Sequence, residues 1–372
     1  MLREETETHL CPGNCRSHKC IDIDAPRGDG NLQFIIKKEV LMGVVYINEN
    51  GAIIGVECNR VIIKYENEMI KSIPIENIDS ITVLGKAQMT TQCMERMLSM
   101  GIPVAFFSKG GRYFGRLEST GHIKAGLQRK QGVLYETEFS LNFSKKIIDA
   151  KLKNQIVVLK RYAKSKNIDV SNHISTINNC IWNVSKAKSV NEINGYEGQG
   201  AKQYFSGLSQ CIDDEFRFNG RNRRPPKDPF NSLLSLGYSI LMNDLYSEIE
   251  NKGLNPYFGF MHKDAEKHPT LASDMIEEWR AVIIDSVVMS LINGHEITKD
   301  CFYNEDDGCY IDKKGLNIFL NKLEKKMMTS VKYLYDVDYP VTFRRAISLQ
   351  VESLVKAIIS DDARIYNPVI IR

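Results

Sequence analysis

The hydrophobic and polar residues of this chain follow two different periods. Between residues 40 and 116, short runs of β-branched and aromatic residues are separated by turn signals such as Asn48-Glu-Asn-Gly51. This alternation predicts short strands, together with one helix over residues 91–100 that ends at Gly101. From about residue 135 the apolar positions recur every three to four residues, which indicates helices over most of the remaining chain.

The two periods predict an α+β protein with a small β-rich domain and a larger helical one. At 372 residues the chain is long enough for two domains. We expect four segments: a polar N-terminal extension (1–38), a β-rich domain suited to association (39–116), a glycine-containing linker (117–128) and a helical domain (129–372).

Composition and charge place the chain among ordinary cytoplasmic proteins. Its 49 basic and 46 acidic residues give a net charge of +3, which by itself does not indicate nucleic-acid binding. No apolar run is long enough to span a membrane, and the charged N-terminus lacks the apolar core of a signal peptide. Six of the nine cysteines are scattered, as expected for reduced thiols.

The other three cysteines gather in the N-terminal extension. Cys11, Cys15 and Cys20 lie beside His9 and His18. Zinc or an iron–sulfur cluster would accept these ligand types, although the spacing matches no standard zinc pattern. The alternative is a tail without a metal.

One stretch combines an imidazole with two carboxylates. His262 ends a short apolar segment, and Asp274 and Glu277 lie three residues apart in a predicted helix, where they share a face. Convergence of these groups would suit a divalent metal that activates an oxygen nucleophile. Alternatively, the acids are favoured near a helix start by the helix dipole alone, and the histidine is structural.

Further candidates precede this stretch. Glu197 lies among glycines, where a ligand can approach closely; the alternative is an exposed glutamate near a helix start. The predicted helix over residues 145–166 carries many bases and a single acid, and residues 217–227 form a basic, proline-containing loop. Such segments suit phosphate contacts, or are simply solvated faces. The candidate DNA-binding residues are Lys145, Lys146, Lys153, Lys160, Arg161, Arg221, Arg223, Arg224 and Lys227.

Six blocks in order resemble the CRISPR spacer-acquisition integrase, CRISPR-associated protein one, from about residue 41 to residue 372. The blocks are Pro74-Ile-Glu-Asn-Ile with Gly85, Gln88 and Thr90; Arg96-x-Leu98-x-x-Gly101; Gly195-Tyr-Glu197-Gly; Asn222 through Gly237-Tyr238; Leu254-x-Pro256 through His262; and Leu271-Ala-x-Asp274-x-x-Glu277-Glu-x-Arg280. Residues 1–38 have no counterpart in the minimal family pattern.

The resemblance implies a β-sandwich-like N-terminal domain that mediates homodimerisation, followed by an all-helical catalytic domain. Its metal ligands for Mg²⁺ or Mn²⁺ are then Glu197, His262 and Glu277, with Asp274 in support by orienting a metal-bound water or tuning His262. The implied reaction is attack by the 3′-hydroxyl of a protospacer on a phosphodiester at a CRISPR repeat. Double-stranded DNA and CRISPR-associated protein two are the implied partners. A catalytically silent DNA-binding assembly subunit and a general nuclease for branched DNA are the alternatives.

Overall fold

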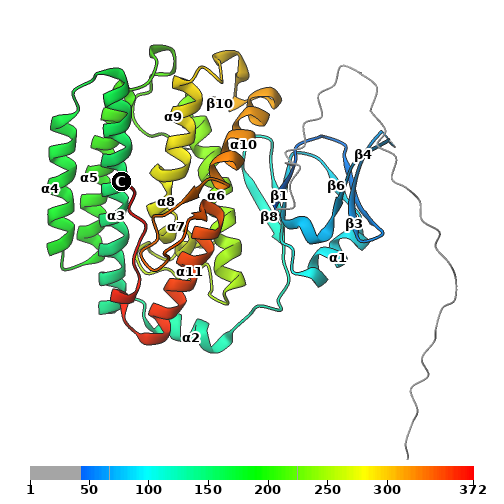
Figure 1. The fold of residues 1–372 in the computed structure, drawn as a ribbon, viewed down its shortest axis with the longest axis horizontal. Helices are drawn as coiled ribbons and strands as arrows, with labels where there is room; N and C mark the ends of the chain where they lie inside the picture. Colours follow the sequence, from blue (N-terminus) through cyan, green and yellow to red (C-terminus); the bar gives the residue numbers. More distant parts are fainter. Residues whose placement is uncertain (1–42, 67, 224) are drawn as a thin grey trace, which may run out of the picture. The chain divides into compact units, whose positions relative to one another are not determined.

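The computed structural model describes residues 43–66, 68–223 and 225–372. The candidates Cys11, Cys15, Cys20 and Arg224 lie outside the described residues. The predicted α+β fold class is confirmed: strands gather in the first, blue-to-cyan part of the ribbon, and the rest is mostly helical (Figure 1). Within the described part of the chain, no helix is both long and apolar enough to cross a membrane.

The β-rich region contains two four-stranded sheets. In the first, the order is β1 (Gly43–Ile47), β5 (Ile78–Leu84), β7 (Val104–Phe107) and β8 (Tyr113–Leu117). In the second, the order is β4 (Glu68–Pro74), β3 (Arg60–Tyr65), β2 (Ile53–Glu57) and β6 (Gln88–Met89). In the first sheet only the β7–β8 pair is antiparallel, and its two parallel pairs need crossover connections, one of which carries α1 (Thr91–Met100).

Strand β1 is buried on both faces. Successive side chains of a strand point to opposite faces, and accordingly Val45 and Ile47 join the core of the β-rich region. Val44 and Tyr46 join the core of the helical region. One strand therefore supplies side chains to two hydrophobic cores.

Helix α1 begins and ends where the sequence predicts. The Thr90 hydroxyl accepts a hydrogen bond from the Cys93 backbone N–H at 3.3 Å, which caps the first turn. Gly101 follows in the left-handed region with φ 68°, a conformation that glycine adopts without a steric penalty.

The helical region is built around one long helix. Helix α3 (Glu138–Lys166) contacts α4 (Ser171–Lys186) and α5 (Val190–Gln210), and also α8 (Glu277–Trp279) and the π-helical turn η3 (Arg280–Asp285). The other helices are α2 (Ala125–Val133), α6 (Pro229–Asn251), α7 (Thr270–Met275), α9 (Ser286–Asn293), α10 (Lys313–Met327) and α11 (Phe343–Ser360). The short 3-10 turns are η1 (Ile75–Asn77), η2 (Asp214–Phe216), η4 (Lys299–Cys301) and η5 (Ala363–Ile365).

Helix α6 shows how local sequence positions the site. Asp228 caps it by accepting a hydrogen bond from the Asn231 backbone N–H at 2.8 Å, and Pro229 is its first residue, where proline is favoured because its missing N–H would have no partner there. Gly237 lets α6 approach η3 closely, because a Cβ there would lie 2.6 Å from the Ile284 side chain.

Several predicted element bounds are wrong. Helix α2 begins inside the stretch predicted as a linker, and Glu197 lies within α5 rather than before a helix. The helical periodicity expected over most of the chain after residue 135 is interrupted after α10 ends at Met327, where β11 (Ser330–Val331) follows and pairs with β12 (Val341–Thr342). A second hairpin, β9 (Phe302–Glu305) with β10 (Gly308–Ile311), also lies among the helices, so the larger region is not helical throughout.

Candidate metal and DNA-binding site

Glu197 and Glu277 come together around one buried lysine. The Lys151 ammonium, on α3, contacts the Glu197 carboxylate of α5 and lies 2.5 Å from Glu277 Oε2 of α8. The Lys151 side chain is only 7% exposed, so its charge is compensated by these two acids rather than by water. Three elements distant in sequence thus meet at one charged centre.

The electrostatics of this centre keep Glu277 ionised. Burial alone would raise the pKa of Glu277, but the positive charges of Arg280 and Lys151 outweigh it and lower the pKa to about 2. Arg280 Nε lies 3.2 Å from Glu277 Oε1. The other oxygen, Glu277 Oε2, is buried and has its ion contact with Lys151 but no hydrogen bond of good geometry.

His262 is held beside this centre by Asp274. The Asp274 carboxylate is fully buried and accepts the backbone N–H groups of Phe260, Met261 and His262 at 2.6, 3.0 and 3.0 Å. It also lies 2.7 Å from His262 Nδ1. An ionised carboxylate only accepts hydrogen bonds, so Nδ1 carries the proton and Nε2 presents its lone pair, the arrangement found in metal-binding histidines.

Nearby charges also act on the His262 ring. Burial would lower the pKa of His262, but its hydrogen bond to Asp274 and the negative charges of Asp274 and Glu277 raise it. Of the groups at the charged centre, Glu277 raises the pKa of His262 and Lys151 lowers it.

The chemical types of the predicted ligands suit a divalent metal, although their ligand atoms do not all converge on one point. Two carboxylates and a neutral imidazole suit Mn²⁺ well and Mg²⁺ acceptably. Among the described residues, Glu118, His122 and Glu250 form the group of three whose ligand atoms all lie within 4.8 Å of one another. Glu197, His262 and Glu277 do not meet that distance. The Glu197 and Glu277 oxygens are brought together by their shared contact with Lys151, so the His262 ring nitrogens are the ligand atoms that lie farther off.

Asp274 and Glu277 have separate surroundings. Helix α7 ends at Met275 and α8 begins at Glu277, and Ile276 between them keeps right-handed helical dihedral angles. Asp274 contacts the loop that carries His262, whereas Glu277 contacts Lys151 and Arg280. The predicted shared face therefore does not produce two equivalent carboxylates.

Lys151 belongs to the basic run of the predicted 145–166 helix, but it lies on the buried face of α3. Lys151 follows Ile147 and Ile148 by four and three residues, in phase with the buried face of α3. A lysine in the apolar phase of a helix is a signal for a buried ion pair. Arg280 was quoted only as part of a motif, and its place beside Glu277 follows from the spacing of three residues.

A polar network continues from Arg280 into the core. The Arg280 guanidinium lies 4.6 Å from the centre of the Tyr238 ring. The Tyr238 and Tyr204 hydroxyls donate hydrogen bonds of 2.5 and 2.8 Å to the buried Asp285 carboxylate. Burial raises the pKa of Asp285 to about 6, although both tyrosines lower it. These contacts anchor α5, α6 and η3 behind the candidate metal ligands.

The predicted DNA-binding residues that the structure describes divide into an exposed group and a group that is half-buried or bonded within the chain. Those with exposed side chains are Lys153, Lys160, Arg161, Arg223 and Lys227. Lys145 is half-buried, and Lys146 donates to the backbone oxygens of Arg364 and Tyr366, each at 2.7 Å. Arg221 donates to Asn231 Oδ1 at 2.7 Å and Ser235 Oγ at 3.1 Å. Lys146 and Arg221 thus hold the chain together, and the exposed group remains suited to phosphate contacts.

Solved structures share this arrangement of a β-rich region followed by a helical one. A Cas1 protein from Thermotoga maritima matches with a TM-score of 0.74 at 24% identity, over 85% of this chain and 97% of that one. A casposase bound to an integration product matches with a TM-score of 0.77 at 22% identity, over 89% and 96% of the two chains. The class of fold is therefore the one common to Cas1 proteins and casposases.

Sequence comparison narrows that class to one family. The profile of the family described as CRISPR associated protein Cas1 matches residues 45–325. The "CRISPR-associated endonuclease Cas1" of Mycobacterium tuberculosis strain H37Rv is 34% identical over 319 residues, which cover 84% of this chain and 93% of the relative. A Thermus thermophilus protein of the same description is 28% identical over 89% of this chain. The chain belongs to the Cas1 family.

Proposed function

We propose that this protein is a metal-dependent DNA endonuclease and integrase that inserts protospacer DNA into a CRISPR array. Its family membership supports a nuclease or integrase of CRISPR adaptation, since the curated relatives are named as CRISPR-associated endonucleases. The finer proposal is that a protospacer 3′-hydroxyl attacks a phosphodiester at the repeat boundary. The single observation that carries it is the convergence of Glu197 and Glu277 on Lys151 with His262 beside them.

Each residue of the site has a role that its contacts support. Glu197, Glu277 and His262 Nε2 would hold Mg²⁺ or Mn²⁺. When bound, the ion would polarise the target phosphate and lower the pKa of the attacking hydroxyl. Asp274 fixes the His262 ring with Nδ1 protonated, and is a positioning residue. Lys151 holds Glu197 and Glu277 in place and offsets part of their negative charge while no ion is bound.

The partners follow from charge and from similarity to known complexes. The exposed bases on α3 and the 217–227 loop would contact the DNA backbone without reading bases. One similar structure is a Cas6-RT-Cas1–Cas2 complex, which matches with a TM-score of 0.76 at 24% identity over 89% of this chain. We therefore infer Cas2 as the partner protein. A homodimer through the β-rich region fits its exposed Met69 and Phe114 side chains.

An integration assay tests this function directly. Purified protein is mixed with its Cas2 partner, a labelled protospacer and a plasmid carrying the repeat array, with Mn²⁺ or with chelator. We expect strand transfer only with the metal, and a loss of at least ~100-fold in Glu197→Ala, His262→Ala and Glu277→Ala, the scale of removing a charge-stabilising group. His295→Ala is the matched control, because His295 is an exposed surface residue.

The same assay separates the alternatives. Strand transfer retained by all three variants would contradict the assigned site. Equal DNA binding with metal and with chelator, without strand transfer by the wild type, would indicate a silent assembly subunit. Cleavage of branched DNA without joining of the protospacer would indicate a general nuclease.

A further inference from the structure

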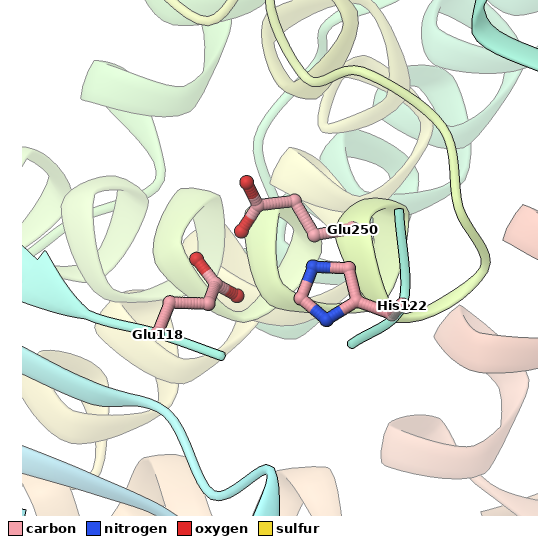
Figure 2. A group of neighbouring side chains, drawn as sticks. All are labelled: Glu118, His122 and Glu250. Atoms are coloured by element: carbon pink, nitrogen blue, oxygen red, sulfur yellow. The ribbon is translucent and has the colours of Figure 1, made fainter. Parts of the chain in front are cut away.

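A second group of metal-type ligands lies away from the candidate catalytic site. Glu118 directly follows β8, His122 lies in the turn before α2, and Glu250 is on the last turn of α6. Figure 2 shows the three side chains pointing toward one another. One ligand atom from each lies within 4.8 Å of the other two, and all three residues are half-buried.

One oxygen of this group has no partner. Glu250 Oε2 is shielded from solvent and makes no hydrogen bond. A buried carboxylate oxygen without a partner is costly, and a cation would satisfy it. The lack of a hydrogen-bond partner for this oxygen is independent of the short distances among the three residues.

The ion pair between Arg116 and Glu118 does not use every acceptor site of the cluster. Arg116 forms a two-pronged pair with Glu118, with Nε 2.7 Å from Oε2 and Nη2 3.1 Å from Oε1. A carboxylate has about four lone-pair sites, so this pair occupies only part of the Glu118 carboxylate. The cluster thus places two glutamates and a histidine beside one arginine.

The segment that carries Glu118 and His122 runs along the end of α6. Arg116 Nη2 donates to Ser247 Oγ at 2.6 Å, and the Arg116 guanidinium lies 4.1 Å from the centre of the Tyr246 ring. Further along, the Lys124 side chain passes so close to Gly253 that a Cβ there would lie 2.6 Å from it. A ligand shared by residues 118, 122 and 250 would therefore join two segments that already touch.

We propose that Glu118, His122 and Glu250 form a second divalent-cation site, separate from the catalytic one, that clamps residues 118–122 to the end of α6. The nitrogen and two oxygen ligands suit Zn²⁺ with water in the remaining position, and Mn²⁺ less strongly. The role of this site is structural: it would restrain the connection between β8 and the helical region.

Zinc counting on the full-length protein tests the site. Wild type, His122→Ala and Glu250→Gln are dialysed against buffered free Zn²⁺, and bound zinc is measured by mass spectrometry of the metal. We expect each variant to bind one equivalent less than the wild type, or to bind that equivalent at least ~10-fold more weakly. The double variant should lose no more than either single one, since both changes remove the same site.

Two controls keep the result specific. His295→Ala should retain every equivalent, because His295 is exposed and lies on another segment. Zinc bound elsewhere in the chain is common to all variants and cancels in the difference. His122→Ala lies in a half-buried turn, and its circular dichroism should match the wild type. Equal zinc binding by the wild type and both variants would overturn the proposal.

Proteolysis gives a second readout that does not depend on stoichiometry. Lys124 is exposed, two residues after His122, and is a site for trypsin. Zinc at ~100 times its dissociation constant should suppress local opening, and so cleavage after Lys124, by up to about 100-fold in the wild type. His122→Ala should show no protection, and protection equal to the wild type would contradict the clamp.

Discussion

The Lys151 ammonium is a shared counter-charge for two acids, Glu197 and Glu277. Its side chain is buried together with that of Glu277, and the half-buried Glu197 completes the group. A buried charge that loses its partner is strongly destabilising. The lysine therefore preserves the geometry of the carboxylates when no metal is bound, and must share or yield its position when one binds.

Replacement of Lys151 tests this role. Lys151→Met keeps a long unbranched side chain but removes the positive charge that Glu197 and Glu277 share, so that Arg280 is left beside Glu277 while Glu197 loses its ion-pair partner. In chelator we expect the free energy of unfolding to fall by about 3–5 kcal/mol. Mn²⁺ should restore stability more in the variant than in the wild type, because it supplies the missing charge. Chemical denaturation with and without Mn²⁺ measures both effects.

Lys153→Met is the matched control for this substitution. Lys153 is exposed on the same helix and pairs only with Asp149 at the surface, at 2.7 Å. Its replacement should change stability by less than ~0.5 kcal/mol. A Lys151→Met protein as stable as the wild type in chelator would show that the lysine does not hold the acids together.

At the scale of elements, the C-terminal segment fixes the short helix that carries Glu277. Glu278, the next residue of α8, accepts hydrogen bonds from the Tyr366 hydroxyl at 2.5 Å and the Val369 N–H at 2.6 Å. Asn154 of α3 donates to the Glu278 and Val369 carbonyls at 3.0 and 2.9 Å, and accepts from the Ile371 N–H at 2.9 Å. The last residues thus bind α3 and α8 to each other directly behind the site.

Asn154→Ala should loosen this attachment. Asn154 is fully buried, so its loss leaves the Ile371 N–H and two carbonyls without partners. We expect a loss of about 1–3 kcal/mol in stability for an unsatisfied buried group. Hydrogen exchange at residues 369–371 should become faster, and strand transfer weaker, because Glu277 is no longer held in place.

The control for that experiment is Asn172→Ala, at an exposed position on α4. It should leave stability, exchange at residues 369–371 and strand transfer unchanged. If the amide hydrogens of residues 369–371 exchanged at the wild-type rate in Asn154→Ala, contacts other than those of Asn154 would hold this segment.

At the scale of the whole molecule, one arginine contacts two acids from different helices, and a tyrosine of the first sheet bonds to one of these acids. Arg344 of α11 donates to both oxygens of Glu324 on α10 at 2.7 and 2.9 Å, and lies 3.6 Å from Asp244 Oδ2 on α6. The Tyr46 hydroxyl of β1 donates to Glu324 at 3.0 Å. Because one guanidinium pairs with both acids, it compensates the negative charge of the more distant one, Asp244, only weakly.

The pH dependence of stability should report Asp244. Burial raises the pKa of Asp244 to about 7, with Arg344 opposing and Glu324 and Glu248 adding to the shift. The unfolded chain loses this proton near 3.8, so between these values the folded chain binds more protons and the free energy of unfolding falls as pH rises. The full effect is at most about 4 kcal/mol, at ~1.4 kcal/mol per unit of pKa.

Asp244→Asn should remove the contribution of Asp244 to this fall in the free energy of unfolding with rising pH. Urea denaturation from pH 4 to pH 8 in chelator would show a smaller loss of stability across the window in the variant. Asp285 and Glu278, whose pKa values burial raises to about 6 and 7, act in the same direction in both proteins. Parallel curves for the variant and the wild type would mean that Asp244 is ionised in the folded state.

The sequence allowed much of the fold to be predicted, because local signals marked it. Helix α1 spans the predicted residues and ends at Gly101 as predicted, and the local signals Asp228 and Pro229 begin α6. The π-helical turn η3 has no such local signal; its Asp285 accepts hydrogen bonds from Tyr204 and Tyr238, and its Ile284 packs against Gly237 of α6.

The candidate site was predictable in its residue types but not in its charge balance. Glu197, His262 and Glu277 were selected by motif, and the structure brings them to one region. That Lys151 bridges the acids follows from the packing of α3 against α5 and α8, which a count of surface bases does not reveal. Arg221, predicted for DNA, is instead occupied by Asn231 and Ser235.

The double burial of β1 has a consequence for cooperativity. Val45 and Ile47 belong to one core and Val44 and Tyr46 to the other, so neither core is complete without the same five-residue strand. Withdrawal of β1 would open both cores at once, which links their unfolding thermodynamically. The β-rich and helical regions should therefore melt in one calorimetric transition, and a fragment without β1 should expose apolar surface in either region.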